Sequence, residues 1–229
     1  MNSKVKINNK SERKNNMVKR LIFDVDGTLI VGVDFIESVK RTLKRFNIYS
    51  EENLENFLKA IKTYETKYNS YNKKDYLNHF GDNLGIKLTD NFLDIFFEEL
   101  KDCIPSKNEK LINTIKELSE KYEMVLLTNY FGKSQLNRLN NMQIGQYFTE
   151  YYGEELIKPN KEIYIKACGK HYPSECVMIG DDLVLDIKGA KEQGLNAIFV
   201  NSKNIDIESK DIIKVDKVEE ITIDLINNI

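Results

Sequence analysis

The chain has 229 residues, 34 basic and 36 acidic side chains, and a net charge of −2 at pH 7. This length accommodates one large domain or two small ones, and the balanced charge gives no general reason to expect a nucleic acid or an anionic membrane as a partner. No apolar run is long enough to span a membrane and no apolar segment precedes Met17, so we expect a cytoplasmic protein. The widely spaced cysteines fit reduced thiols better than a disulfide framework: Cys103, Cys168 and Cys176.

The first twenty residues are strongly basic, because they carry seven Lys and Arg side chains and one acid, Glu12. A segment of this kind either binds nucleic acid or a membrane, or is a solvated tail. We favour a disordered tail over residues 1–16, since this stretch contains neither aromatic residues nor helical periodicity.

An acidic motif follows the first predicted strand. The apolar run Leu21–Phe23 ends at Asp24, and Asp26 follows shortly after. Carboxylates at the end of a buried strand are costly unless they bind a cation or take part in chemistry. One can act as a nucleophile, the other can carry a proton, and both can face a hard metal ion. Gly27 then allows the chain to turn sharply beside a ligand.

Residues 34–104 are predicted to form a helical block. Apolar side chains recur there at helical spacing, and no strand pattern interrupts them. Gly81, Gly85 and the pair Thr89–Asp90 mark turns and helix starts. We expect about four helices that pack as a small bundle inserted directly after the first strand.

From Pro105 onward, strand and helix patterns alternate. Predicted strands end at Thr128, at Tyr152 and at Gly180, and another spans residues 196–200. The intervening helices include one that starts at Pro159 and one over residues 186–193, which Gly194 ends. This alternation predicts a doubly wound α/β fold with a parallel sheet, in which residues 17–33 and 105–229 form the core.

Further polar residues lie at or just past the predicted strand ends. Thr128 and Asn129 follow one strand, and Lys158 precedes a helix. Three acids follow the strand that ends at Gly180: Asp181, Asp182 and Asp186. Because the carboxyl ends of parallel strands meet in one crevice, we expect these residues and Asp24 to lie together.

The four stretches resemble, in order and in strand context, the four motifs of the haloacid dehalogenase (HAD) superfamily. The resemblance covers residues from about Lys19 to Val200, and it is to the phosphatase branch because dehalogenase members lack the acid found here at Asp26. It implies a Rossmann-like core with a central first strand, and an all-α helical cap that closes over the site. The implied activity is Mg²⁺-dependent hydrolysis of a small phosphorylated metabolite, with a nucleoside monophosphate as the first candidate.

The resemblance also implies a role for each motif residue. Asp24 would attack phosphorus and form an aspartyl-phosphate, and Asp26 would protonate the leaving oxygen and later take a proton from water. The phosphoryl group would be bound by Thr128, Asn129 and Lys158. The turn after the nucleophile would be shaped by Gly27 and Thr28.

A cation is also implied, since a carboxylate nucleophile and a phosphate dianion repel each other. Mg²⁺ suits this position because it prefers oxygen ligands. The implied ligands are the side chains of Asp24 and Asp181 and the backbone carbonyl of Asp26. Asp182 and Asp186 would act directly, through water or by orienting neighbours, and the sequence leaves the division between them open.

Three other functions fit parts of the pattern. A phosphomutase of the same family would use the same Asp24 chemistry but return the phosphoryl group to its substrate. A phospho-accepting receiver domain has a similar set of acids but no helical insertion after its first strand, and an inactive scaffold would lack Asp24 or Asp181. We favour the phosphatase, acting as a monomer or weak dimer on a small phosphorylated substrate, with no nucleic-acid or membrane partner.

Histidine and tyrosine side chains offer additional possibilities. His79 and His171 could act as bases, but the motifs already supply an acid, a base and a nucleophile, so we favour structural roles for both. A group of tyrosines in the helical block could stack on a nucleobase or sugar, although the helical spacing of the first two favours packing within the block: Tyr64, Tyr68, Tyr71 and Tyr76.

Overall fold

The computed structural model describes residues 17–206 and 211–229, and the tail predicted over residues 1–16 lies outside them. Parallel strands form one sheet in the order β3-β2-β1-β4-β5-β6. Their bounds are β1 Arg20–Phe23, β2 Glu123–Leu127, β3 Glu150–Tyr152, β4 Cys176–Gly180, β5 Asn196–Val200 and β6 Ile213–Val215. The doubly wound sheet with a central first strand is therefore confirmed.

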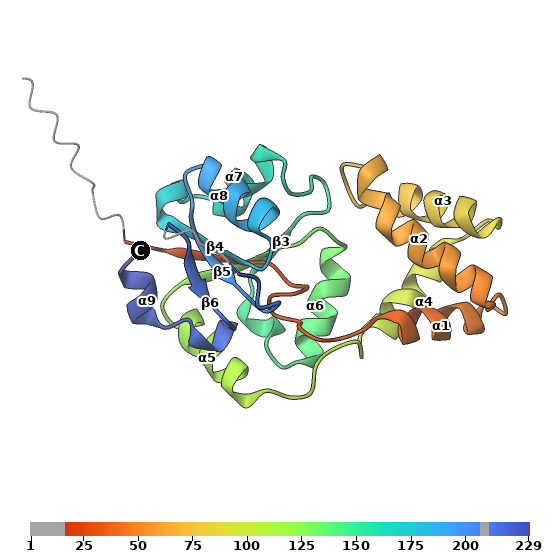
Figure 1. The fold of residues 1–229 in the computed structure, drawn as a ribbon, viewed down its shortest axis with the longest axis horizontal. Helices are drawn as coiled ribbons and strands as arrows, with labels where there is room; N and C mark the ends of the chain where they lie inside the picture. Colours follow the sequence, from red (N-terminus) through yellow and green to blue (C-terminus); the bar gives the residue numbers. More distant parts are fainter. Residues whose placement is uncertain (1–16, 207–210) are drawn as a thin grey trace, which may run out of the picture.

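Helices cover both faces of this sheet (Figure 1). Side chains alternate along each strand, so Leu21 and Phe23 of β1 enter one apolar core and Ile22 enters the other. The first core is covered by α5 Glu109–Ser119, α6 Gly132–Asn141 and α9 Ile223–Asn227. The second is covered by α7 Lys161–Cys168 and α8 Gly189–Glu192. Burial on both faces explains why these strands read as continuous apolar runs.

A separate helical unit is inserted between β1 and α5, as the sequence predicts, and it lies to one side of the sheet (Figure 1). It contains α1 Ile36–Arg45, α2 Glu51–Lys67, α3 Lys73–Leu84 and α4 Asp90–Leu100. Its own core is aromatic: the Phe57 ring centroid lies 4.6 Å from that of Phe80 and 5.3 Å from that of Phe96. The domain boundaries at residues 33/34 and 104/105 stay a prediction.

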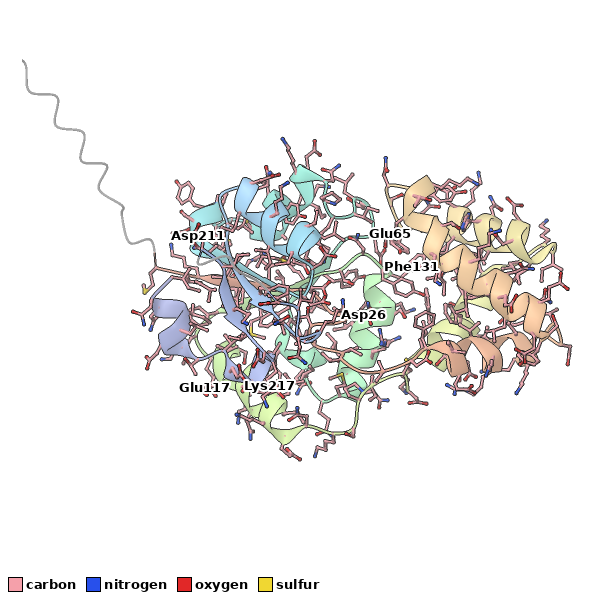
Figure 2. All side chains as sticks on the ribbon, in the orientation of Figure 1. Asp26, Glu65, Glu117, Phe131, Asp211 and Lys217 are labelled. Carbon is pink, nitrogen blue, oxygen red and sulfur yellow. The ribbon has the colours of Figure 1, made fainter. Side chains whose placement is uncertain are left out.

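The helical unit also packs against the sheet-containing core. Phe131 and Ile157 come from the core but belong to the apolar cluster of the helical unit. Figure 2 shows Phe131 where the two units meet, with Glu65 of α2 nearby. The four helices therefore form a cap above the carboxyl ends of β1 and β2.

Two predicted helix starts are wrong. The helix after Lys158 begins at Lys161 and not at Pro159, because the Asn160 side chain caps it by accepting from the Glu162 N–H at 2.9 Å. The helix predicted over residues 186–193 begins earlier, as a π-helical segment over Leu183–Lys188 that continues into α8. The Asp182 side chain caps this earlier start by accepting from the N–H groups of Val184 and Leu185.

The last part of the chain carries elements that the motifs do not predict, namely β6 and α9. Across residues 17–206 and 211–229, no helix has the length and apolar character needed to cross a membrane.

All three cysteines are free, as expected, and they are buried.

Candidate active site

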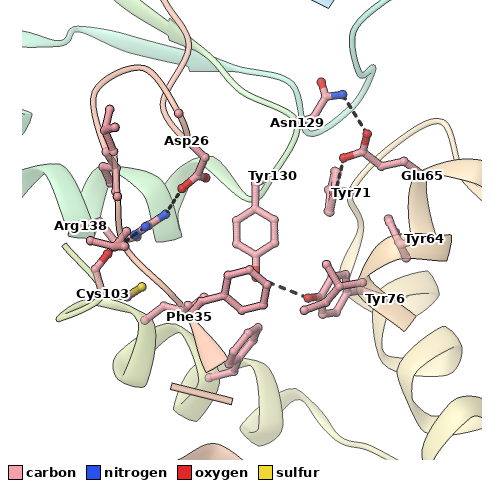
Figure 3. Close-up of a pocket in the computed structure, with 18 of the residues that line it drawn as sticks. Asp26, Phe35, Tyr64, Glu65, Tyr71, Tyr76, Cys103, Asn129, Tyr130 and Arg138 are labelled. Atoms are coloured by element: carbon pink, nitrogen blue, oxygen red, sulfur yellow. Dashed lines mark hydrogen bonds and ion pairs between the residues drawn. The ribbon is translucent and has the colours of Figure 1, made fainter. Parts of the chain in front are cut away.

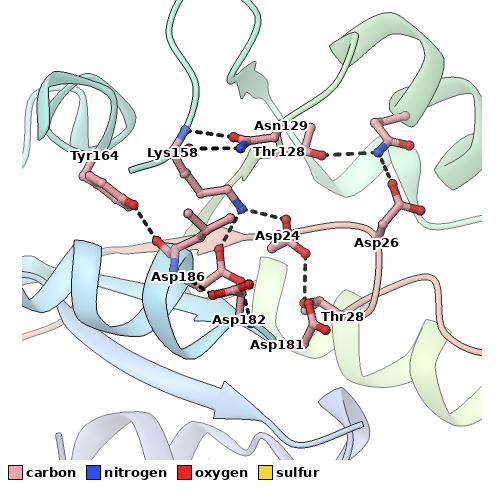
Figure 4. A network of polar contacts seen from close by, with 12 residues as sticks. Asp24, Asp26, Thr28, Thr128, Asn129, Lys158, Tyr164, Asp181, Asp182 and Asp186 are labelled. Atoms are coloured by element: carbon pink, nitrogen blue, oxygen red, sulfur yellow. Dashed lines mark hydrogen bonds and ion pairs between the residues drawn. The ribbon is translucent and has the colours of Figure 1, made fainter. Parts of the chain in front are cut away.

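The carboxyl ends of β1, β2 and β4 bring the predicted site residues together (Figure 4). Asp24 follows β1 directly, and its backbone N–H still donates to the Ile179 carbonyl of β4 at 2.9 Å. Thr128 follows β2, and Asp181 follows β4. Each of these side chains therefore extends from the end of a rigid strand, which fixes its position.

Lys158 lies between two of the carboxylates. Its Nζ is 2.7 Å from Asp24 Oδ1 and 2.6 Å from Asp186 Oδ1, and all three side chains are buried. Burial alone would lower the pKa of Lys158, but the two carboxylates outweigh burial and raise it. Lys158 is therefore a permanent cation beside Asp24.

Asp24 has the perturbed electrostatics of a reactive group. Burial raises its pKa to about 7, although the Lys158 ammonium acts in the opposite direction. The Thr28 hydroxyl donates to Asp24 Oδ2 at 3.1 Å, so Thr28 contacts the candidate nucleophile as well as the turn. A buried carboxylate with one oxygen on Lys158 and the other on Thr28 is held in a single orientation.

Three carboxylates form a compact acidic cluster. One oxygen each from Asp24, Asp181 and Asp186 lies within 4.8 Å of the others, and all three residues are buried. Three hard oxygen donors at this separation fit a divalent cation such as Mg²⁺. Gly27 makes room for the cluster: its φ is +90°, and a Cβ there would lie 2.3 Å from Asp181 Oδ2.

Asp182 and Asp186, whose roles the sequence leaves open, have different positions in the structure. Asp182 Oδ1 accepts from the N–H groups of Val184 and Leu185, both at 2.8 Å, so it caps the π-helical segment. Asp186 faces the cluster, and its Oδ2 accepts from the Asp182 N–H at 3.0 Å. Asp186 thus belongs to the carboxylate cluster, and Asp182 caps the helical segment beside it.

Asp26 points away from the acidic cluster toward α6. Its Oδ1 lies 2.7 Å from Arg138 Nη1, and its Oδ2 accepts from Gln135 Nε2. Gln135 also donates to the Thr128 hydroxyl oxygen at 3.2 Å. The side chain of Asp26 is therefore outside the three-carboxylate cluster, and the metal contact predicted for its backbone carbonyl stays a prediction.

Asn129 connects the second motif to the third. Its Oδ1 accepts from the Lys158 N–H at 2.8 Å, and its Nδ2 donates to the Lys158 carbonyl at 3.0 Å. The same Nδ2 donates to Glu65 Oε2 of the cap at 3.1 Å. The side chain of Asn129 therefore holds the segment that carries Lys158, a contact that the sequence does not predict.

Four polar residues near the site lie outside the motifs and were missed by sequence reasoning: Glu65, Gln135, Arg138 and Lys203. Lys203 Nζ is 2.7 Å from Asp181 Oδ2, while the neighbouring Ser202 hydroxyl donates to the Gly27 carbonyl at 2.8 Å. The spacing of Gln135 and Arg138 on one face of the helix after Thr128 is the one available sequence clue.

Neither histidine belongs to the cluster, in agreement with the structural roles predicted for them. His79 Nε2 contacts the Ala60 carbonyl at 3.0 Å and the Thr63 hydroxyl at 3.2 Å, within the cap. His171 contacts Glu123 at 2.9 Å, and Glu123 starts β2 at the opposite end of the sheet.

A family model for haloacid dehalogenase-like hydrolases matches residues 18–194. The chain belongs to this family. It is therefore a HAD hydrolase, and a curated relative to which it is similar is a phosphatase. That relative is the glyceraldehyde 3-phosphate phosphatase of Methanopyrus kandleri, which is 27% identical over 80% of this chain and 84% of its own.

Solved structures of HAD proteins share the fold. A HAD phosphatase from Thermococcus onnurineus matches with a TM-score of 0.62 and 22% identity, over 89% of this chain and 95% of its own. A magnesium-bound HAD hydrolase from Bacillus subtilis matches with a TM-score of 0.62 and 20% identity, over 93% and 100%. At these identities the likeness shows the fold, including the inserted helical cap.

Proposed function

We propose that this HAD hydrolase is a Mg²⁺-dependent phosphomonoesterase that acts on a small phosphorylated metabolite through an aspartyl-phosphate on Asp24. A nucleoside monophosphate is the first substrate candidate. The observation that carries the proposal is the position of Asp24: it is buried, bound to Lys158 at 2.7 Å and part of a compact carboxylate cluster. A purely structural aspartate has no need of this arrangement.

The first half of the reaction would form the covalent intermediate. A carboxylate oxygen of Asp24 attacks phosphorus, the bond from phosphorus to the ester oxygen breaks, and Asp26 gives its proton to the departing oxygen. Lys158 and the Thr128 hydroxyl would contact the phosphoryl oxygens and stabilise the charge that develops on them. The Asn129 backbone N–H would assist, while its side chain keeps Lys158 in position.

The second half would regenerate the enzyme. A water molecule gives a proton to Asp26 while the oxygen of the water bonds to phosphorus. The bond from phosphorus to Asp24 breaks, and inorganic phosphate is released. A bound Mg²⁺ would be held by Asp24, Asp181 and Asp186, with the Asp26 carbonyl as the further predicted ligand, and would supply charge neutralisation at the phosphoryl group. Asp182, Gly27 and Thr28 would shape the loops that carry these ligands.

The supporting context is consistent with a metabolic enzyme. The buried free cysteines suit a reducing compartment, so we also propose a cytoplasmic location. We propose a monomer or weak dimer, which sedimentation analysis would test directly.

Product analysis tests the proposal. Purified protein with Mg²⁺ is expected to release inorganic phosphate from several phosphate monoesters, detected by phosphorus NMR, and to stop when a chelator is added. Isomerised phosphate esters in place of inorganic phosphate would instead identify a phosphomutase. Undiminished activity after complete metal removal would reject the metal-dependent mechanism.

A further inference from the structure

A cavity of about 650 Å³ lies between the cap and the core, directly beside the catalytic cluster (Figure 3). Asp26 and Asn129 belong both to the site and to the cavity wall, and Lys203 lines it as well. A phosphate ester with its phosphorus near Asp24 would therefore place its leaving group in this space. The volume falls within the range of pockets that bury most of a ligand.

The cavity wall is largely aromatic. Tyr64, Tyr71, Tyr76 and Phe80 line it from the cap, and Tyr130 lines it from the core. Figure 3 shows the Tyr130 ring projecting into the middle of this space. Phe35, on the segment that leads into the cap, is 37% exposed although it is a large apolar side chain. An exposed aromatic ring in a pocket wall, such as that of Phe35, favours stacking with a flat ligand.

Two hydroxyl groups converge from opposite sides in the aromatic part of the cavity. The hydroxyl oxygens of Tyr76 in the cap and Tyr130 in the core lie 3.4 Å apart, at the outer limit of a hydrogen bond. Each hydroxyl can both donate and accept, so a ligand atom that lies beside the pair can form a hydrogen bond with each of them. At the rim, Glu65 accepts from the Tyr71 hydroxyl at 2.6 Å and from Asn129.

We propose that this cavity selects phosphate monoesters whose leaving group carries a planar ring with a polar edge, such as a nucleobase or a pyridine ring. The proposal rests on the phosphatase function above and names its substrate class. The ring faces would stack on Tyr130 and Phe35, and the polar edge would meet the hydroxyls of Tyr76 and Tyr130. A triose leaving group, which is small and polar throughout, would leave most of the cavity unfilled and place its hydroxyls against apolar rings.

Tyr130 is the specificity residue in this proposal because of its place in the chain. It follows Thr128 and Asn129 directly, so its ring has a fixed relation to the phosphate-binding groups. The cap supplies the opposite wall. One site would therefore recognise both parts of the substrate: the phosphoryl group, and the size and edge polarity of the ring in the leaving group.

The first test measures binding and not turnover. The full-length Asp24→Asn variant, in Mg²⁺, is titrated calorimetrically with ring-bearing esters (adenosine 5′-monophosphate, uridine 5′-monophosphate, pyridoxal 5′-phosphate, 1-naphthyl phosphate) and with ring-free esters (ribose 5-phosphate, glyceraldehyde 3-phosphate). We expect the best ring-bearing ester to bind at least about tenfold more tightly than either ring-free ester. Binding of the ring-free esters as tightly as all ring-bearing ones would overturn the proposal.

Variants of the wall locate the effect. Phe35→Ala, made in the Asp24→Asn background, is expected to reduce ring-ester affinity about threefold to tenfold and leave ribose 5-phosphate unchanged. Tyr130→Phe is expected to weaken polar-edged rings but not 1-naphthyl phosphate. Tyr172→Phe is the matched control, because Tyr172 is 73% exposed and lies outside the cavity. Equal losses for ring-bearing and ring-free esters in both variants would count against the proposal.

The same panel separates failure of this inference from failure of the proposed function, when wild-type phosphate release is measured beside binding. Release from the ring-free esters alone would leave the phosphatase intact and reject the ring pocket. Ring-selective binding with no release from any ester would keep the ring pocket and reject the phosphatase.

Discussion

Arg138 binds the Asp26 carboxylate at 2.7 Å and, with the same guanidinium, the Cys103 carbonyl at 2.8 and 3.1 Å. Cys103 lies on the segment that returns from the cap to the core. The candidate proton donor is thus connected through one buried side chain to the segment on which the cap is carried. A movement of the cap would therefore shift Arg138 and, with it, the Asp26 carboxylate.

Replacing Arg138 by lysine tests this connection. A lysine ammonium cannot bind Asp26 and the Cys103 carbonyl in the fork geometry of a guanidinium. We expect Arg138→Lys to lower the single-turnover rate of Asp24 phosphorylation about tenfold for an alkyl phosphate, whose leaving oxygen needs a proton, and less than about twofold for p-nitrophenyl phosphate, whose leaving group does not. The control is Arg41→Lys, on an exposed cap residue that pairs with Glu99. Equal losses on both substrates would argue against a role through Asp26.

Lys203 is expected to weaken metal binding. Its ammonium is paired with Asp181, one of the three clustered carboxylates, and would compete with a cation for that carboxylate. Because the Lys203 side chain is 66% exposed, the ion pair is weak and a cation can displace it. Lys203→Met should therefore tighten Mg²⁺ binding about twofold to fivefold, measured by calorimetry without substrate. Lys188→Met is the control on the neighbouring π-helical segment, where Lys188 pairs with Glu192 at 4.0 Å. Unchanged or weaker binding in Lys203→Met would contradict this expectation.

Metal affinity should also depend on pH. Burial raises the pKa of Asp24 to about 7, so below pH 7 a proton competes with the cation for this carboxylate. The apparent Kd for Mg²⁺ should therefore fall as the pH rises from 6 through about 7 and then level off, with proton release on binding at the lower pH. Calorimetry in buffers of different ionisation enthalpy measures both quantities. An affinity that is constant from pH 6 to 8 would show that Asp24 is already ionised throughout.

Most of the carboxylate cluster could be predicted from the sequence because two of its residues stand directly at the end of an apolar strand. Asp24 and Asp181 directly follow β1 and β4, and parallel strands bring their carboxyl ends together whatever the rest of the chain does. The cap helices were predictable for a similar local reason, since their apolar stripes face one shared core.

The missed residues depend on tertiary packing. Arg138 on α6 has the local pattern of a surface arginine, and only the approach of the Cys103 segment buries it. Lys203 reaches Asp181 from the loop after β5, a contact that no spacing within the chain predicts. The two wrong helix starts have a smaller cause, because the capping side chains of Asn160 and Asp182 compete with Pro159 and Asp186 as start positions.

The far end of the sheet should show acid-dependent stability. The pKa of Glu123 is lowered to about 2 by hydrogen bonds from Lys170, His171 and Arg20. A lowered carboxyl pKa contributes stability that is present above the unfolded value and lost as the pH falls toward the folded one. Because Glu123 is 38% exposed, screening limits this contribution to about 0.5–1 kcal/mol at neutral pH.

Denaturant unfolding of Glu123→Gln and wild type at several pH values measures this contribution. The difference in unfolding free energy should be largest near pH 7 and shrink as the pH is lowered below about 4. Glu120→Gln, on an exposed neighbour at the end of α5, serves as the control. A difference for Glu123→Gln that does not change with pH would mean that the loss comes from packing and not from charge.

The central claim, that Asp24 attacks phosphorus, is tested most directly by trapping the intermediate. Wild-type enzyme is mixed with substrate and Mg²⁺, quenched in acid within milliseconds, digested and analysed by mass spectrometry. We predict a phosphoryl group on the peptide that contains Asp24, its absence in Asp24→Asn, and its retention in the control Asp216→Asn on the core surface. Phosphate release by wild type with no label on Asp24, or turnover by Asp24→Asn within about tenfold of wild type, would show that another group attacks phosphorus.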